Sequence, residues 1–162
     1  MTIKSKARQI LRSLVTAQGL IFIICLINFI VRGIEVDRID RQMRAYGGGE
    51  HWYPGQIMIE PFLLLVAGGL LLFNRWWALL VSLLASARVV YSLGYLPWLS
   101  IHYAHDVPMF SSQAMQRLWH VIYQPHPEYP FQVALGGVVF ICASVLLTRV
   151  ALRKPVLAPV GG

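Results

Sequence analysis

The chain has 162 residues, of which 57% are hydrophobic and 13% are charged, and its formal net charge is +7. Soluble domains carry about 25% charged residues, so this composition argues against a water-soluble domain and indicates one small membrane domain covering residues 1–162. The basic residues lie beside apolar runs. This arrangement favours topology signals and lipid-headgroup contacts, and it argues against nucleic-acid binding.

Four apolar segments are each near the length of about 20 residues that crosses about 30 Å of hydrocarbon as a helix. The first is followed by "VRGIEVDR" without a small-residue cleavage site, so we expect it to be retained as a span. The second and third are joined by the short turn "NRWW" and must form an antiparallel hairpin. The predicted fold is an all-α antiparallel bundle of four membrane helices, with spans at 14–31, 57–73, 77–99 and 131–148 and outer loops at 32–56 and 100–130.

The first outer loop has the pattern of a helix. Two acid–base pairs, Asp37–Arg41 and Asp40–Arg44, stand at i,i+4 spacing, and apolar residues recur between them. The first helix is therefore predicted to extend beyond the bilayer until the glycines at 47–49 end it. This extension is either a solvated helix or a surface for a partner subunit.

The second outer loop contains "SSQAMQRLWHVIYQ", which begins with serine N-cap candidates. Met115, Leu118, Trp119 and Ile122 recur at helical spacing on one face. The segment is predicted to form a short interfacial helix between the third and fourth spans, lying on the outer bilayer surface.

Lysine and arginine positions indicate the orientation, because cytoplasmic segments carry an excess of these residues. With both termini on one side, that side holds eight basic residues and the outer loops hold five. We expect both termini in the cytoplasm, in what is most simply a bacterial inner membrane. The eight are Lys4, Lys6, Arg8, Arg12, Arg75, Arg149, Arg153 and Lys154; the five are Arg32, Arg38, Arg41, Arg44 and Arg117.

Arg88 lies near the middle of the third span, where an unpaired arginine costs about 2.5–3.5 kcal/mol on insertion scales. Three interpretations remain open: an internal ion pair that fixes helix register, a partner outside the chain, or a substrate or proton site within the bundle. The first and third require a buried polar cluster, for which the sequence offers Arg88, Glu60, Tyr91, Tyr95 and Asn28.

The remaining candidates are glycine pairs and a histidine group. Gly68–Gly69 and Gly136–Gly137 are expected to allow close helix packing. His102, His105 and Asp106 share a helical face and are a weak metal candidate. No span contains a histidine, which argues against bis-histidine haem, so no cofactor is predicted, although a bound lipid or quinone fits the composition.

These features favour a non-catalytic accessory subunit of a larger integral-membrane complex, respiratory, photosynthetic or transport, in contact with lipids and other membrane subunits. The alternative is a small carrier or binding protein for a lipid- or quinone-like molecule that uses the Arg88 cluster. A third interpretation is an enzyme that uses the outer-face histidines, but the sequence contains no nucleophile motif or nucleotide-binding motif.

Overall fold

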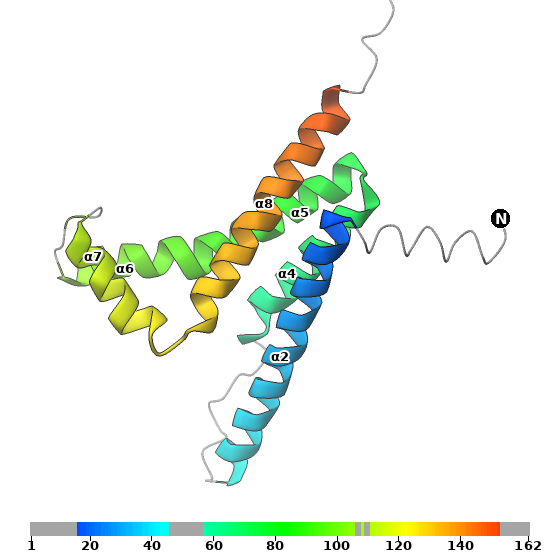
Figure 1. The fold of residues 1–162 in the computed structure, drawn as a ribbon. Helices are drawn as coiled ribbons and strands as arrows, with labels where there is room; N and C mark the ends of the chain where they lie inside the picture. The colour runs from blue at the N-terminus through cyan, green and yellow to red at the C-terminus, as the bar shows by residue number, and fades with distance from the viewer. Residues whose placement is uncertain (1–15, 46–56, 106–107, 109–110, 153–162) are drawn as a thin grey trace, which may run out of the picture.

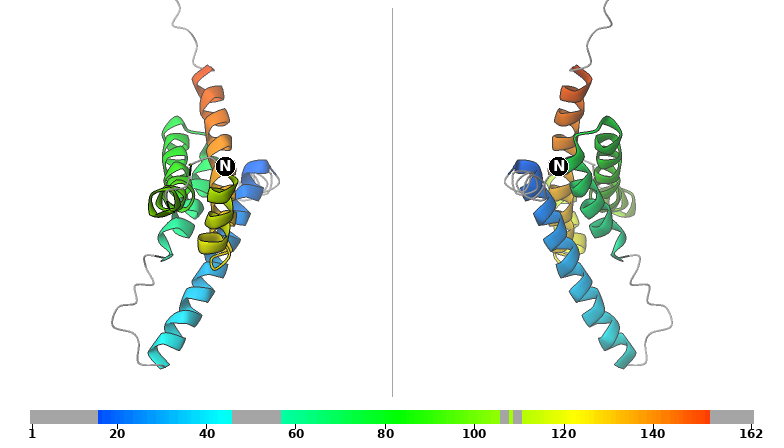
Figure 2. Two further views of the ribbon diagram at one scale, coloured as in Figure 1. Left: turned by 90° about the vertical axis from the view of Figure 1, so that its left-hand side faces the viewer. Right: turned by 90° about the vertical axis from the view of Figure 1, so that its right-hand side faces the viewer.

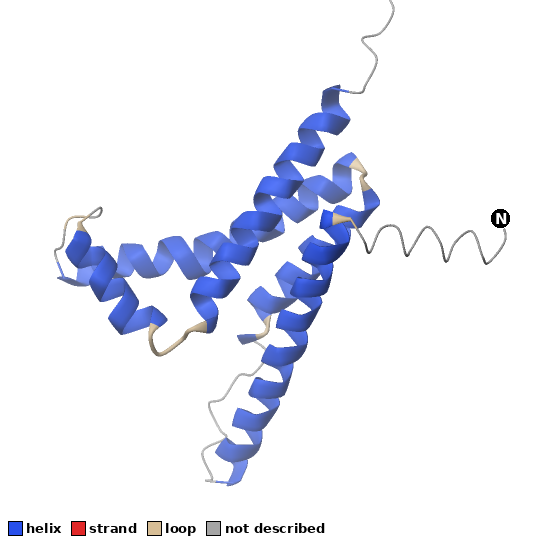
Figure 3. Cartoon of the chain, in the orientation of Figure 1, coloured by secondary structure: helices blue, strands red, loops and turns tan. Residues whose placement is uncertain are grey.

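The computed structural model describes residues 16–45, 57–105, 108 and 111–152. In this part of the chain the regular structure is entirely helical (Figure 3). The elements are α2 (Ala17–Ala45), α4 (Ile59–Leu70), the 3₁₀ turn η2 (Leu71–Phe73), α5 (Trp76–Val90), the π-helical turn η3 (Tyr91–Tyr95), α6 (Leu96–His105), α7 (Ser112–Leu118), the π-helical turn η4 (Trp119–Tyr123) and α8 (Glu128–Leu152) (Figure 1).

Three helices are long and apolar enough to cross a membrane: Ala17–Ala45, Trp76–Ala104 and Glu128–Leu152. A fourth apolar helix, Ile59–Phe73, is shorter. At 1.5 Å per residue it rises about 22 Å, which is less than the hydrocarbon thickness of about 30 Å. The prediction of a helical chain with apolar helices of membrane length is confirmed for three helices in the described residues, and the fourth is shorter.

Helix α2 continues well beyond the expected span, as the sequence predicts. Arg41 pairs with Asp37 and Arg44 pairs with Asp40, the second pair at 2.9 Å between Nη2 and Oδ2. The lower half of α2 extends away from the other labelled helices in Figure 1. Because exposed i,i+4 pairs contribute only about 0.3–0.5 kcal/mol each, they support this extension without anchoring it to the rest of the chain.

The turn between α4 and α5 is closed by residues suited to it. Asn74 adopts a left-handed backbone conformation (φ 48°), which asparagine tolerates better than most residues. Gln18 Nε2 of α2 donates a hydrogen bond to Asn74 Oδ1 at 3.1 Å. Farther along the hairpin, the buried Ser82 hydroxyl donates to the Ala67 carbonyl oxygen at 2.8 Å. Polar contacts thus join α2, α4 and α5 where their apolar faces meet.

Of the four glycines in the two predicted pairs, two stand at close helix contacts. A Cβ atom on Gly68 would lie 2.9 Å from Cys25 Sγ of α2, and one on Gly136 would lie 3.2 Å from Val90 Cγ2 of α5. Gly69 faces the Phe22 ring at 3.5 Å, whereas a Cβ on Gly137 would meet nothing within 4 Å. Gly68 and Gly136 therefore permit the close approach of α4 to α2 and of α8 to α5.

The core lies where α2, α4, α5 and α8 meet, and its fully buried members include Cys25, Leu64, Leu79 and Val139. The rod from α5 to α6 crosses α8 obliquely in Figure 1 and is foreshortened in the side views of Figure 2, where α2 and α8 keep their length. The helices therefore differ from the aligned antiparallel bundle expected from the sequence, since the α5–α6 rod turns away from the common axis.

The helix that begins at Trp76 also runs past its expected end at residue 99, to His105, although Pro97 lies within it. Proline has no N–H, so the Leu93 carbonyl four residues earlier loses its usual donor. The helix widens into the π-helical turn η3 just before Pro97, and the Tyr123 hydroxyl of η4 donates to the Leu93 carbonyl oxygen at 3.2 Å. The predicted helix in the second outer loop is present as α7 and η4, and this bond ties it to the third long helix.

Replacing Tyr123 with phenylalanine should remove its hydrogen bond to the Leu93 carbonyl oxygen and lower the free energy of unfolding by about 1 kcal/mol. Burial raises the pKa of Tyr123, so the hydroxyl keeps its proton at neutral pH. Thermal unfolding of the purified protein in detergent measures the effect. Tyr103→Phe is the control, because Tyr103 is 76% exposed. Equal melting temperatures for the two variants would contradict this role.

Candidate functional site

Arg88 lies on the outward face of α5, in a continuous exposed stripe. The stripe residues recur every three or four positions, so they share one side of the helix. The buried side of α5 carries Ser82, Ser86 and Val89 instead. We call this surface the α5 stripe; it consists of Trp77, Val81, Leu84 and Arg88 on α5 and of Tyr91 and Tyr95 on the turn η3 that continues it.

The α5 stripe has one charge and no neutralising group of its own. In the part of the chain that the structure describes, Arg88 forms no ion pair, with Glu60 or with any other acid. Tyr91 and Tyr95 stack on each other, with ring centroids 5.6 Å apart. The sequence hypothesis of one buried cluster thus differs from the structure, in which Arg88, Tyr91 and Tyr95 are exposed, because position 88 faces away from the core.

Beside the stripe, α5 and α8 form a shallow groove of about 430 Å³. Tyr91 and Tyr95 form one wall of the groove and Phe140 and Ile141 another. Gly137, whose Cα has open space around it, also lines it. The groove is therefore continuous with the α5 stripe and almost wholly apolar.

Of the other two members of the hypothesis, Asn28 belongs to a different group of polar residues, and Glu60 lies outside that group. Its centre is Arg32 of α2, which pairs with Glu35 one turn later and with Glu128 at the start of α8, the latter at 3.0 Å between Nη2 and Oε1. The side chains of Arg32 and Glu128 are 12% and 20% exposed. This pair joins the first and last long helices. We call Asn28, Arg32, Glu35 and Glu128 the Arg32 cluster.

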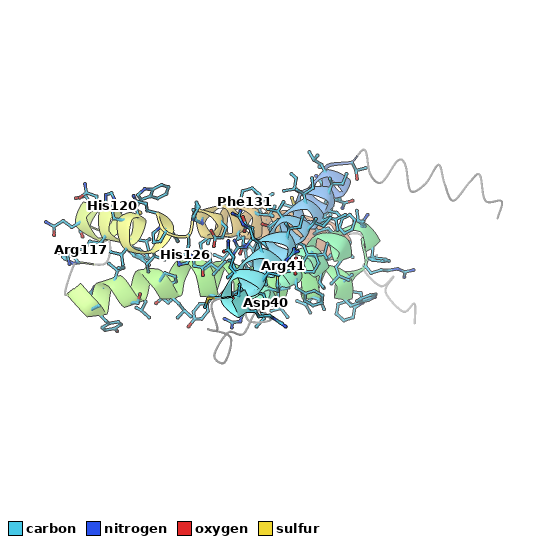
Figure 4. All side chains as sticks on the ribbon, turned by 90° about the horizontal axis from the view of Figure 1, so that it is seen from below. Asp40, Arg41, Arg117, His120, His126 and Phe131 are labelled. Atoms are coloured by element: carbon cyan, nitrogen blue, oxygen red, sulfur yellow. The ribbon has the colours of Figure 1, made fainter. Side chains whose placement is uncertain are left out.

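Further groups surround the Arg32 cluster at the start of α8. His126 Nδ1 lies 3.5 Å from Glu128 Oε1, and the His126 and Tyr129 rings stack with centroids 4.8 Å apart. The charges of Glu128, Arg32 and Glu60 all act on Tyr129, so Glu60 of α4 lies in the same region. Figure 4 shows His126 and Phe131 near the start of α8, whereas Arg117 and His120 lie farther away, on the segment α7–η4 that packs beside α6 (the α7 hairpin).

A cleft of about 380 Å³ opens between α2 and α8 beneath the Arg32 cluster. Two donor atoms of its lining residues, Asn28 Nδ2 and Arg32 Nε, are buried within the protein and have no hydrogen-bond acceptor among the described residues. Asn28 is only 7% exposed. Apolar side chains form the rest of the lining: Ile24, Ile27, Val31 and Phe131.

The sequence did not predict this arrangement. Arg32 and Glu128 lie far apart in the chain, and each stands at the end of an apolar segment, where a charge is ordinary. The available signal was their level: Arg32 ends the first apolar run and Glu128 precedes the fourth, so both are at the same end of the helices. The two residues can be paired because they stand at the same level of two helices, but both lie outside the apolar segments themselves.

Only part of the weak metal candidate, His102, His105 and Asp106, lies among the described residues. His102 is half-buried, and its ring is in contact with that of Tyr103, with centroids 5.2 Å apart. The side chain of His105 and all of Asp106 fall outside the described residues. In the residues that are described, no group of three histidine, cysteine, aspartate or glutamate side chains is placed to hold a metal ion.

Compared with known protein families, curated proteins and solved structures, the chain matches none. Its function must therefore be argued from the α5 stripe and the Arg32 cluster themselves.

Replacing Arg32 with leucine should destabilise the protein strongly, because the largely buried Glu128 then loses its arginine partner. Breaking a buried pair from one side costs about 3–5 kcal/mol, against about 0.2–1 kcal/mol for an exposed pair. The matched control is Arg41→Leu, which breaks the exposed pair with Asp37. Thermal unfolding in detergent should show a much larger drop for Arg32→Leu; similar drops would contradict a structural role for the Arg32–Glu128 pair.

Proposed function

We propose that the chain is a non-catalytic subunit of a larger integral-membrane complex and that the α5 stripe is its contact with a partner helix. The observation that carries the proposal is Arg88, an exposed cation in the middle of an apolar helix with no acid beside it in the described chain. A respiratory, photosynthetic or transport assembly supplies the kind of partner required: a membrane helix with a carboxylate at the depth of Arg88.

The first argument is energetic. An unneutralised arginine at mid-membrane costs about 2.5–3.5 kcal/mol on insertion scales. A carboxylate on a neighbouring helix offsets this cost and fixes the pairing partner, since a single polar position in a helix seam specifies register. Exposed apolar residues alone carry no such implication, because lipid covers them equally well.

The second argument is geometric. Alternate steps of three and four residues along the α5 stripe are the spacing with which one helix packs along another. The adjoining groove has Gly137 in its lining, and small residues let a second helix approach closely in membranes. The stripe and the groove together make a surface shaped for a helix and marked by one charge.

The remaining topology follows from the same proposal. Helices α2, α5–α6 and α8 span the bilayer. Ile59–Phe73 is a short fourth span, and the bilayer is thinner around it. Both termini lie on the cytoplasmic side of a bacterial plasma membrane, in agreement with the distribution of lysine and arginine. The α7 hairpin then lies at the outer surface.

Native mass spectrometry of the protein extracted in mild detergent tests the proposal. The wild-type chain should be recovered in a complex with other membrane subunits, and Arg88→Leu should lower the recovered complex at least tenfold while the chain still accumulates. Arg88→Lys should retain part of it, because the charge remains. Arg75→Leu is the control, since Arg75 is an exposed cation in the α4–α5 turn.

Two results would contradict the proposal. One is a free monomer from wild-type membranes under conditions that preserve other complexes. The other is an Arg88→Leu chain that assembles as well as the Arg75→Leu control.

The alternative of a lipid or quinone carrier centred on Arg88 has less support. A carrier site encloses its ligand, and Arg88 stands on an exposed face. Two buried donors without an acceptor in the described chain lie at the Arg32 cluster instead, on a different pair of helices.

A further inference from the structure

A depression with a polar end and an apolar groove lies between the start of α2, the turn between α4 and α5 and the second half of α8 (Figure 1). The polar end has a volume of about 270 Å³ and the groove about 390 Å³. Both are lined by Gln18, Leu146 and Arg149, so they are continuous. We call this surface the Arg149 depression; it includes Gln18, Asn74 and Arg149 at the polar end and Ile141, Val145 and Leu146 in the groove.

The polar groups of the Arg149 depression are accessible from outside the protein. Arg149 and Asn74 are exposed, and Gln18 is half-buried. Arg149 forms no ion pair within the described part of the chain. Gln18 Nε2 donates to Asn74 Oδ1, which orients the Asn74 amide and leaves its nitrogen as a donor. An oxyanion at this end therefore meets a guanidinium and an amide N–H group.

The charges around the Arg149 depression select an anion. No acidic side chain among the described residues lines it. At 1.5 Å per residue, Glu35, Glu60 and Glu128 are each about 20–30 Å away along their own helices. The segments 1–15 and 153–162, which adjoin α2 and α8 in sequence, contain six basic residues and no acid. A phosphate is attracted to this end of the molecule, whereas the cationic group of a zwitterionic lipid finds no carboxylate among the residues that line the depression.

The groove favours a lipid over a free phosphate. From Arg149 to Ile141 it follows α8 for about 12 Å. Ile141 and Val145 are 63% and 46% exposed, so an acyl chain in the groove covers them directly. Trp76, which follows the α4–α5 turn, is also exposed, and tryptophan is enriched at the level of the headgroups in membrane proteins. A free phosphate leaves the groove uncovered.

We infer that the Arg149 depression binds an anionic phospholipid. The headgroup phosphate accepts hydrogen bonds from the Arg149 guanidinium and the Asn74 amide, and an acyl chain lies along Val145. Arginine suits this role because its planar guanidinium donates two parallel hydrogen bonds to one phosphate. The depression shares no residue with the α5 stripe, so the inference does not depend on the proposed subunit role.

Native mass spectrometry of the delipidated full-length protein in detergent tests the inference, because it identifies each bound lipid by its mass. The probes are dioleoyl phosphatidylglycerol, dioleoyl phosphatidylcholine with the same acyl chains, and inorganic phosphate. We expect one phosphatidylglycerol to bind at a lipid concentration at least tenfold below that required for phosphatidylcholine. An excess of inorganic phosphate should not displace it.

Two pairs of variants link the binding to the depression. Arg149→Leu should weaken phosphatidylglycerol binding at least tenfold, whereas Arg75→Leu, which removes an exposed charge from the neighbouring turn, should weaken it far less. Val145→Trp fills the groove and should also weaken binding, whereas Val138→Trp, at another exposed position on α8, should not. Because all four side chains are exposed, the melting temperatures of the variants should stay close to that of the wild type.

The inference is overturned if phosphatidylcholine binds as tightly as phosphatidylglycerol, or if inorganic phosphate displaces the lipid and so proves to be the ligand. Equal weakening by Arg149→Leu and Arg75→Leu would also overturn it, because the basic end would then attract lipid without a defined site. So would a second copy of the chain in the groove, detected as a dimer that Val145→Trp abolishes.

Discussion

The cost of an unpaired charge in an apolar environment is the constraint on which this structure depends. The chain meets it in two ways. Arg32 is neutralised within the chain, by Glu35 and by Glu128, and the Arg32–Glu128 pair joins the middle of α2 to the start of α8. Arg88 is exposed on α5 with no acid beside it in the described chain. One arginine therefore belongs to the fold, and the other lies on the surface that we propose a partner helix covers.

Small and polar residues set how the helices meet. Gly68 and Gly136 let neighbouring backbones approach closely, and the Ser82 hydroxyl bonds across the α4–α5 hairpin to the Ala67 carbonyl. Because apolar side chains gain little by leaving lipid for one another, such contacts carry much of the specificity of membrane helix packing. Tyr123 acts similarly, because its hydroxyl donates to the Leu93 carbonyl oxygen, four residues before Pro97, which has no N–H to donate.

The sequence predicted the helices well because hydrophobicity and i,i+4 charge pairs are local. It predicted the extension of α2 from Asp37–Arg41 and Asp40–Arg44, and the outer helix near Trp119. It did not predict the Arg32–Glu128 pair or the side of α5 that Arg88 faces, because both depend on helix rotation and crossing. The sequence indicates how far along their helices Arg88 and Glu60 lie, but it does not indicate the rotation of each helix about its axis.

The central claim, that a group outside the chain neutralises Arg88, is tested most directly by crosslinking in native membranes. A photoreactive phenylalanine analogue at Leu84, one turn from Arg88 on the α5 stripe, should form a discrete crosslink to a membrane-protein helix. Mass spectrometry of the product should find an aspartate or glutamate close to the attachment site, and Arg88→Leu should remove the crosslink. Attachment at Leu84 to lipid acyl chains alone would contradict the account.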